Sequence, residues 1–296
     1  MQTVSISNKQ FSELERLRFD NNIMNTEGQL FIEQSNDGNK KIIKKFYRCD
    51  SDDDEYFANK LLTINYLIDL KDQIGIDELV LPEKIVIENG QIVGSMMRYI
   101  DNINFKNIIN SYKIPTEKVI NYFKEIGIIL KKIEDLNKNN IINPFHLNDV
   151  HESNFIFNKE TKKINVVDLD SARILNNTPF AARYLTPFSP VADLPYKYKV
   201  CDESASGYIE PDNNSDIYCF IIMILNYLYK DKVNQMKIPE YYEYLNYLLK
   251  IDFPYELLDN FERVYKYDDN INPYELLDLI PKNIEEASSK VYKKIQ

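Results

Sequence analysis

The stretch of sequence that decides the fold is residues 148–157, which read Asn-Asp-Val-His-Glu-Ser-Asn-Phe-Ile-Phe. A second stretch, residues 166–171, reads Val-Val-Asp-Leu-Asp-Ser. Each joins carboxylate or amide side chains to an apolar β-rich segment, and the polar residues between them predict a turn. We therefore expect a β-hairpin that brings Asp149 and Asn154 of the first stretch close to Asp168 of the second.

Phosphoryl transfer is the chemistry that this spacing suits. The reaction needs a carboxylate near the acceptor hydroxyl and oxygen ligands for a magnesium ion that bridges the phosphates. Asp149 would face the acceptor, whereas Asn154 and Asp168 would approach the metal from opposite sides. A solvated turn followed by an ordinary acidic strand end is the structural alternative for the same residues.

On these residues the sequence resembles the protein-kinase-like superfamily, and within it the serine/threonine protein kinases of bacterial or viral type. The catalytic loop of that family has Asp, four residues and Asn before an apolar strand, and Asp-Phe-Gly follows one hairpin later. The resemblance covers roughly residues 22–296 and implies an α+β, bilobal protein-kinase-like fold. Residues 1–98 would form an N-lobe, a small antiparallel sheet with one helix. Residues 99–296 would form a larger, mostly helical C-lobe with the catalytic loop and the activation segment.

The apolar pattern along the chain agrees with a small sheet followed by helices. Two hairpin signals, Asn36-Asp37-Gly38 and Asn89-Gly90, each join two β-rich segments. A helical apolar spacing lies between the two hairpins, and another predicts an amphipathic helix farther along. The expected strands are residues 29–34, 40–47, 83–88 and 91–99, and the expected helices are residues 57–68 and 116–136.

Two residues near the N-terminus match the phosphate-binding part of the family. Lys44, in an Ile-Ile-Lys-Lys-Phe segment, resembles the strand lysine that holds the α- and β-phosphates, and Lys45 is the alternative. Gly28 lies near the place of the last glycine of the phosphate loop. Ile23 and Asn25 stand where the first two glycines would be, in a chain with only 7 glycines. The backbone would therefore approach the phosphates less easily here.

Residues 96–101, Met-Met-Arg-Tyr-Ile-Asp, are similar to the hinge that joins the two lobes of the family. The resemblance implies that adenine lies near Met97 and that backbone groups of Arg98 and Ile100 are its hydrogen-bond partners. An edge strand packed on a helix is the alternative. Farther along the chain, Asp216 begins a buried apolar helix, and the resemblance implies that it holds the backbone of the catalytic loop.

Several positions depart from the family. Asp170 replaces the glycine of Asp-Phe-Gly, and it would either add a metal ligand, which we favour, or cap the turn. Asn148 replaces the arginine that pairs with a phosphorylated activation loop, so switching by that route is not expected. Glu55 is the nearest candidate for the helix glutamate that pairs with Lys44, but the apolar register puts Lys60 in that place.

The expected function is an ATP- and Mg²⁺-dependent protein kinase that acts on Ser or Thr hydroxyls of a protein substrate, with Asp149 and Lys44 as catalytic residues. Val150-His151 is closer to aminoglycoside-type phosphotransferases, so a small-molecule kinase of that type stays open. His151 would orient the loop, contact phosphate or serve the structure alone. The missing glycines leave a third possibility, a pseudokinase that acts as a binding module.

Composition restricts the partners and the compartment. The formal net charge of -10 argues against nucleic acid as a partner, because phosphate binding needs a basic face. Cys49, Cys201 and Cys219 are odd in number and widely spaced, which suits a reducing cytosol. The longest apolar run, residues 217–228, is interrupted by Asn226 and is shorter than the roughly 20 residues of a membrane span. We therefore expect a cytoplasmic protein with no membrane segment.

Overall fold

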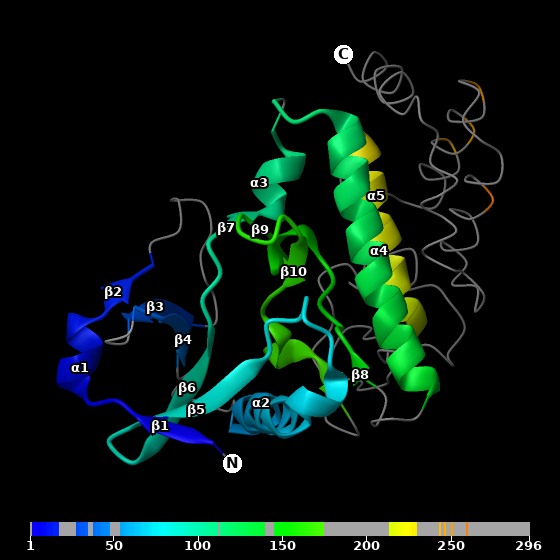
Figure 1. Cartoon of the computed structure of the whole chain (residues 1–296). Helices are drawn as coiled ribbons and strands as arrows, with labels where there is room; N and C mark the ends of the chain where they lie inside the picture. The colour runs from blue at the N-terminus through cyan, green and yellow to red at the C-terminus, as the bar shows by residue number, and fades with distance from the viewer. Residues whose placement is uncertain are drawn as a thin grey trace.

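The computed structural model describes residues 2–17, 28–34, 38–47, 54–111, 113–139, 145–174 and 213–229, with the single helical positions 243, 246, 250 and 259. These residues form a mixed α/β structure whose largest element is a mostly antiparallel sheet (Figure 1). The expected mixture of sheet and helices is confirmed at this level. The expected activation segment and most of the later helices lie outside the described residues.

The large sheet has six strands in the order β1-β5-β6-β4-β3-β2. All neighbouring strands are antiparallel except β1 and β5, which are parallel. The strands are β1 (Thr3–Ser5), β2 (Glu15–Arg16), β3 (Gly28–Gln34), β4 (Lys40–Phe46), β5 (Pro82–Glu88) and β6 (Gln91–Arg98). Both expected pairs of strands are present, and Asn89 and Gly90 turn β5 into β6 with φ of 52° and 78°. Positive φ at both turn residues is the reason that an Asn-Gly pair suits this hairpin.

Helix α2 (Asp54–Ile74) follows strand β4. It begins within the acidic stretch 51–55 that is expected to open it and continues past Ile68, the last residue of the expected apolar spacing. The helix ends at Gly75, which has a φ of 56° and donates its N–H to the carbonyl of Lys71 at 3.3 Å. This left-handed glycine is a common helix ending, because glycine adopts positive φ without a Cβ clash. Residues 78–80 then form backbone hydrogen bonds with Val166 before the chain returns to the sheet as β5.

The second part of the chain forms helices and short strands on the other side of α2 (Figure 1). Strand β9 pairs with β10 and with β7, and β8 pairs with β11. The pairing of Phe155 with Val166 confirms the expected hairpin. The elements are β7 (Asn102–Asn104), α3 (Phe105–Ile109), α4 (Thr116–Lys138), β8 (Phe145–His146), the 3-10 turn η1 (Glu152–Asn154), β9 (Phe155–Asn158), β10 (Ile164–Val166), the 3-10 turn η2 (Leu169–Ser171), β11 (Arg173–Ile174) and α5 (Asn213–Tyr229).

The main core lies between α4, α5 and the short strands. Helices α4 and α5 lie side by side in Figure 1, and the expected apolar face of α4 is buried between them. Phe123 of α4 contacts Phe105 edge-on, with 5.2 Å between ring centroids, and Phe220 of α5 at 6.2 Å. Burial of each such side chain contributes about 1.5–3 kcal/mol. The loop that contains Leu147 and Val150 therefore rests on a well-packed core.

A smaller apolar core lies on one face of the large sheet, beneath an N-terminal segment that the sequence pattern does not predict. Helix α1 (Asn8–Glu13) begins with a capping box between Ser7 and Gln10. Its Phe11 packs edge-on against Phe31 of β3, with 5.4 Å between centroids. No described helix has both the length and the apolar character needed to cross a membrane.

Candidate active site

Lys44 and Lys45 lie on opposite faces of strand β4, as the two-residue period of a strand requires. Lys45 faces the N-terminal segment, where its Nζ lies 2.8 Å from Glu88 and 4.3 Å from the ring centroid of Phe11. Lys44 is only 4% exposed and faces the loops that follow β10. Of the two lysines that the sequence offers, Lys44 is therefore the one that reaches Asp168.

Lys44 belongs to a cluster of four charged side chains, with Asp168, Asp170 and Lys60. Its Nζ contacts Asp168 and lies 2.8 Å from Oδ2 of Asp170, and the Nζ of Lys60 lies 3.3 Å from the same oxygen. Burial alone would raise the pKa of the Asp170 carboxyl, but the charges and hydrogen bonds of Lys44 and Lys60 hold this pKa well below its usual value. The carboxylate of Asp170 is thus ionised between two ammonium groups.

Among its described side chains, helix α2 presents Lys60 to the cluster around Lys44. Lys60 is 3% exposed, in agreement with the apolar register of the sequence. The side chain of Glu55, the other candidate, is outside the described part. Thr63, one turn after Lys60, also contacts this region, because its hydroxyl donates to the carbonyl of Ala172 at 3.4 Å. Helix α2 is therefore attached to the η2 turn by polar contacts as well as by packing.

Asp149, His151 and Asn154 form a second cluster, in the loop between β8 and β9. The amide Nδ2 of Asn154 donates to the backbone oxygen and to Oδ2 of Asp149, both at 3.0 Å. His151 Nδ1 accepts the N–H of Ser153 at 3.2 Å, so Nε2 carries the proton of a neutral ring. That Nε2 lies 3.2 Å from Oδ2 of Asp149. Oδ2 of Asp149 thus has two side-chain partners, His151 and Asn154.

Backbone contacts join the two clusters. The N–H of Val167 donates to the carbonyl of Asn154 at 2.9 Å, and the side chain of Asn148 donates to the carbonyl of Ser171 at 3.0 Å. Asn148 and Asp168 both have left-handed backbones, with φ of 63° and 62°. Such conformations cost free energy and often occur at functional sites, where the surrounding contacts maintain them. The expected approach of Asp168 to the loop of Asn154 is therefore present in the fold.

Asp216 of helix α5 anchors the start of the same loop. Its Oδ2 accepts the N–H of Leu147 and its Oδ1 accepts the N–H of Asn148, both at 2.8 Å. Asp216 is itself buried. This confirms the sequence expectation that Asp216 holds the backbone of the loop with Asp149.

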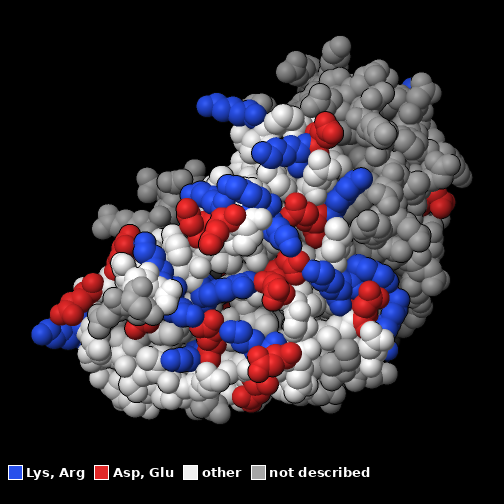
Figure 2. Space-filling model, in the orientation of Figure 1, with Lys and Arg blue, Asp and Glu red and all other residues white. Residues whose placement is uncertain are grey.

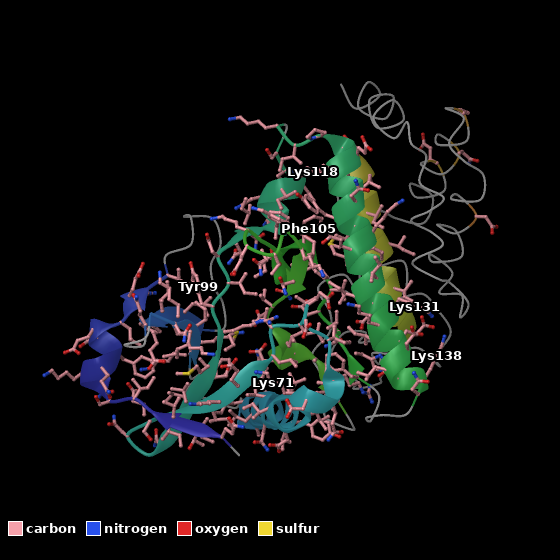
Figure 3. All side chains as sticks on the ribbon, in the orientation of Figure 1. Lys71, Tyr99, Phe105, Lys118, Lys131 and Lys138 are labelled. Atoms are coloured by element: carbon pink, nitrogen blue, oxygen red, sulfur yellow. The ribbon has the colours of Figure 1, made fainter. Side chains whose placement is uncertain are left out.

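The expected hinge residues lie where the chain leaves the sheet. Tyr99, labelled in Figure 3, follows the last residue of β6. The side chain of Arg98 donates to the carbonyl of Leu79 at 3.2 Å and to that of Asp77. Beside this crossing is a small apolar cluster, separate from the main core, that contains Val80, Ile100 and Ile156 with the partly buried Met97 and Val167. The cluster thus joins strand β6 to the two stretches 148–157 and 166–171, through Ile156 and Val167.

Gly28 is the first residue of β3 and pairs with Phe46. A Cβ on Gly28 would lie 2.5 Å from the carbonyl oxygen of Lys45, so the close approach of the two strands requires glycine. The structure thus gives Gly28 a packing role. Ile23 and Asn25, the other positions of the expected phosphate loop, lie outside the described residues.

Oxygen donors suited to magnesium come from Asn154 and Asp168. Because Asn154 directs its Nδ2 to Asp149, its Oδ1 is the amide atom left to act as an acceptor or ligand. Mg²⁺ commonly takes one or two protein ligands and completes its shell with water and phosphate, so this donor set fits. Asp170, the third expected ligand, directs Oδ2 to the lysines, and its Oδ1 is buried without a hydrogen-bond partner. Among the described residues, no three His, Cys, Asp or Glu side chains gather as a metal cluster would require.

The described surface has mixed charges. Figure 2 shows Lys and Arg interspersed with Asp and Glu over the visible face.

No protein-family model matches the chain, and neither does any curated protein. The fold and the contacts of the site therefore provide the argument about function.

Proposed function

We propose that the protein is an ATP- and Mg²⁺-dependent phosphotransferase of the protein-kinase-like class, which transfers the γ-phosphate of ATP to a Ser or Thr hydroxyl of a protein. The observation that supports this most directly is the convergence of Lys44, Asp168 and the Asp149–Asn154 loop. Lys44 comes from the large sheet and the other groups from the two sides of one hairpin far along the chain, and each side chain has the polarity that phosphoryl transfer needs at its position.

The bilobal arrangement belongs to the same proposal. Residues 1–98 would form the N-lobe with the six-stranded sheet, and residues 99–296 would form the C-lobe. The nucleotide would bind between the two, with its adenine on the apolar cluster of Val80, Ile100 and Ile156. Met97 at the edge of this cluster would contact the base, and backbone groups of Arg98 and Ile100 would bond to it.

Each site residue has a distinct role in this proposal. Lys44 would bind the α- and β-phosphates, while Asn154 and Asp168 would hold magnesium. The metal would neutralise charge on the phosphates and help to align them. Asp149, oriented by His151 and Asn154, would accept a hydrogen bond from the acceptor hydroxyl and direct it at the phosphate. A loose transition state needs no strong base, so a carboxylate is sufficient.

Two other functions have specific support. The contact of His151 with Asp149 favours a small-molecule kinase, because the sequence at this position resembles aminoglycoside phosphotransferases. The presence of Lys60 where a glutamate is expected favours a pseudokinase that binds a nucleotide without turnover. The retained Asp149, Asn154, Asp168 and Lys44 rank a kinase above a pseudokinase. The short stretch between Asp101 and Asp149 leaves little room for a substrate-binding insertion, which ranks the protein kinase above the small-molecule kinase.

Phosphate transfer from labelled ATP in the presence of Mg²⁺ tests the proposal. The full chain would be incubated with generic protein acceptors and, separately, with a panel of small hydroxyl and amino compounds. We expect transfer to protein, reduced by at least about 100-fold in Asp149→Asn and in Asp168→Asn. Asp135→Asn is the matched control, because Asp135 is an exposed partner of Lys131 on helix α4, outside the proposed site.

Each outcome identifies one function. Transfer to small compounds alone would indicate the aminoglycoside-type alternative. Mg²⁺-dependent stabilisation by ATP without transfer to any acceptor would indicate a pseudokinase. Full activity in both aspartate variants would refute the site itself.

A further inference from the structure

One carboxylate oxygen lies between two buried lysines. Oδ2 of Asp170 is 2.8 Å from the Nζ of Lys44 and 3.3 Å from that of Lys60. Both ammonium groups also lie over the ring of Phe46, at 5.5 Å and 5.7 Å from its centroid. Asp170 and Phe46 therefore bind the two lysines together, one through charge and the other through its aromatic face.

This arrangement restricts a side chain that is flexible by nature. A lysine has a four-carbon stem with several rotatable bonds, and its ammonium group keeps no fixed direction unless a partner provides one. Asp170, together with Asp168, provides that direction for Lys44, and Lys60 joins Asp170 to helix α2. Asp170 is only 7% exposed, so water competes little for these contacts.

The same geometry opposes a metal at Asp170. A divalent cation on this carboxylate would lie close to two ammonium groups in a buried region, where repulsion between like charges is poorly screened. The side chain of Asp168 is more exposed than that of Asp170, 36% against 6%. Of the two aspartates, Asp168 is the better placed to reach a metal that arrives with a nucleotide.

We propose that Asp170 and Lys60 form a positioning pair that fastens Lys44 to helix α2, and that Asp170 does not ligate the metal. The pair would take the place of a helix glutamate, with the carboxylate moved from the helix to the turn after Asp168. The role of Lys44 in this proposal rests on the proposed phosphotransferase function. The contact among Lys44, Lys60 and Asp170 does not depend on that function, so it can be tested without nucleotide.

A double-mutant cycle on the unliganded protein tests the pair. Stability would be measured by denaturant unfolding for Lys60→Met, Asp170→Asn and the double variant. We expect the double variant to be more stable than Asp170→Asn, because removal of Lys60 relieves the positive charge that loss of the carboxylate leaves buried. The coupling should be about tenfold or more in the unfolding equilibrium constant. Lys71→Met is the control on the same helix. Lys71, which is labelled in Figure 3, is more exposed than Lys60 and pairs with Glu83.

Two results of the cycle would overturn the pair. One is additivity, with a coupling below twofold. The other is a double variant that fails to fold while Lys60→Met folds. If Asp170→Asn does not fold by itself, folding restored by Lys60→Met in the double variant meets the expectation.

Nucleotide binding separates a positioning role from metal ligation. We expect Lys60→Met and the double variant to raise the KM for ATP about tenfold and to leave the Mg²⁺ concentration for half-maximal activity within twofold of wild type. Asp168→Asn, a proposed metal ligand, should raise that Mg²⁺ concentration. If the Mg²⁺ concentration for half-maximal activity instead rises tenfold in the double variant, Asp170 is a metal ligand and the proposal is wrong. If the wild-type protein neither binds ATP nor transfers phosphate, the proposed function fails while the cycle still decides on the pair.

Discussion

Lys60 of helix α2 and Asp170 of the η2 turn contact each other across 110 residues of sequence, with 3.3 Å between Nζ and Oδ2. The contact joins the helix beside the large sheet to the loop that follows the β9–β10 hairpin. Because Lys44 shares the same carboxylate, a change at position 60 or 170 alters the charge around a third residue on another element. The site is therefore a coupled set of charges, and substitutions in it should not be additive.

Asp216 should be the most sensitive residue outside the charged cluster. Asp216→Asn removes one of the two oxygens that accept the N–H groups of Leu147 and Asn148. A buried N–H without an acceptor costs about 1–3 kcal/mol, so we expect a loss of about 2 kcal/mol in the free energy of unfolding. Denaturant unfolding measures this loss. Asp135→Asn, at an exposed pair with Lys131, should change stability by less than about 0.5 kcal/mol, and equal effects would contradict the anchoring role of Asp216.

His146 should make stability depend on pH. Burial lowers the pKa of His146 from 6.5 to about 4, and the charge of Arg173 acts in the same direction. The folded state thus prefers the neutral ring. The contribution of His146 to the free energy of unfolding is therefore fully present above pH 6.5 and is lost as the pH falls toward 4. We expect a loss of about 2 kcal/mol between pH 7.5 and pH 5. Denaturant unfolding of wild type and His146→Gln at both pH values checks this, and the same loss in both proteins would disprove it.

Gly94 should be irreplaceable because of its position beside Lys44. A Cβ at Gly94 would lie 1.9 Å from the carbonyl oxygen of Lys44, so the strands β4 and β6 would have to separate. We expect Gly94→Ala to cost at least about 2 kcal/mol of stability and to weaken ATP binding, since the backbone of Lys44 moves. Gly38→Ala is the control. Gly38 has a φ of 83° with open space around it, so its cost of about 1 kcal/mol should come from backbone strain alone, with ATP binding unchanged.

His151 should affect the rate of transfer more than nucleotide binding. Loss of the contact between its Nε2 and Asp149 in His151→Leu releases one side of the carboxylate. We expect kcat to fall by about 10- to 100-fold while the KM for ATP stays within about threefold. His151→Gln, whose amide can donate to Asp149, should retain more activity. Equal kcat values in the two variants would show that the hydrogen bond does not orient Asp149.

Local patterns predicted much of the fold. The two hairpins depend on Gly38, Asn89 and Gly90, whose backbone preferences act within the turn itself. Helix α4 follows from its apolar period. The approach of Asp168 to Asn154 also follows from local structure, because a single short hairpin separates the two residues. The anchoring of this loop by Asp216 followed from the family resemblance, not from local pattern.

Other features depend on contacts between distant residues and could not be derived in this way. The parallel pairing of Thr3 with Ile85 involves a three-residue strand with almost no pattern of its own. The role of Asp170 depends on Lys60, and the sequence register placed Lys60 on the correct face without revealing its partner. Favouring a metal at Asp170 was reasonable for a second carboxylate near Asp168, but the two lysines change its electrostatic surroundings.

The contact of residues 78–80 with strand β10 joins the connection between α2 and β5 to the second part of the chain. Val80 donates its N–H to the carbonyl of Val166 at 2.8 Å, and Val166 donates to that of Glu78 at 2.9 Å. Val80 also packs with Ile100, where the chain crosses out of the sheet. The connection from α2 to β5 (residues 75–81) and that from β6 to β7 (residues 99–101) thus lie close together, and we expect them to act as a pivot. In the proposed function, movement of the sheet about this pivot would separate Lys44 from Asp168 and Asp170 together, because the two aspartates lie two residues apart at the same turn.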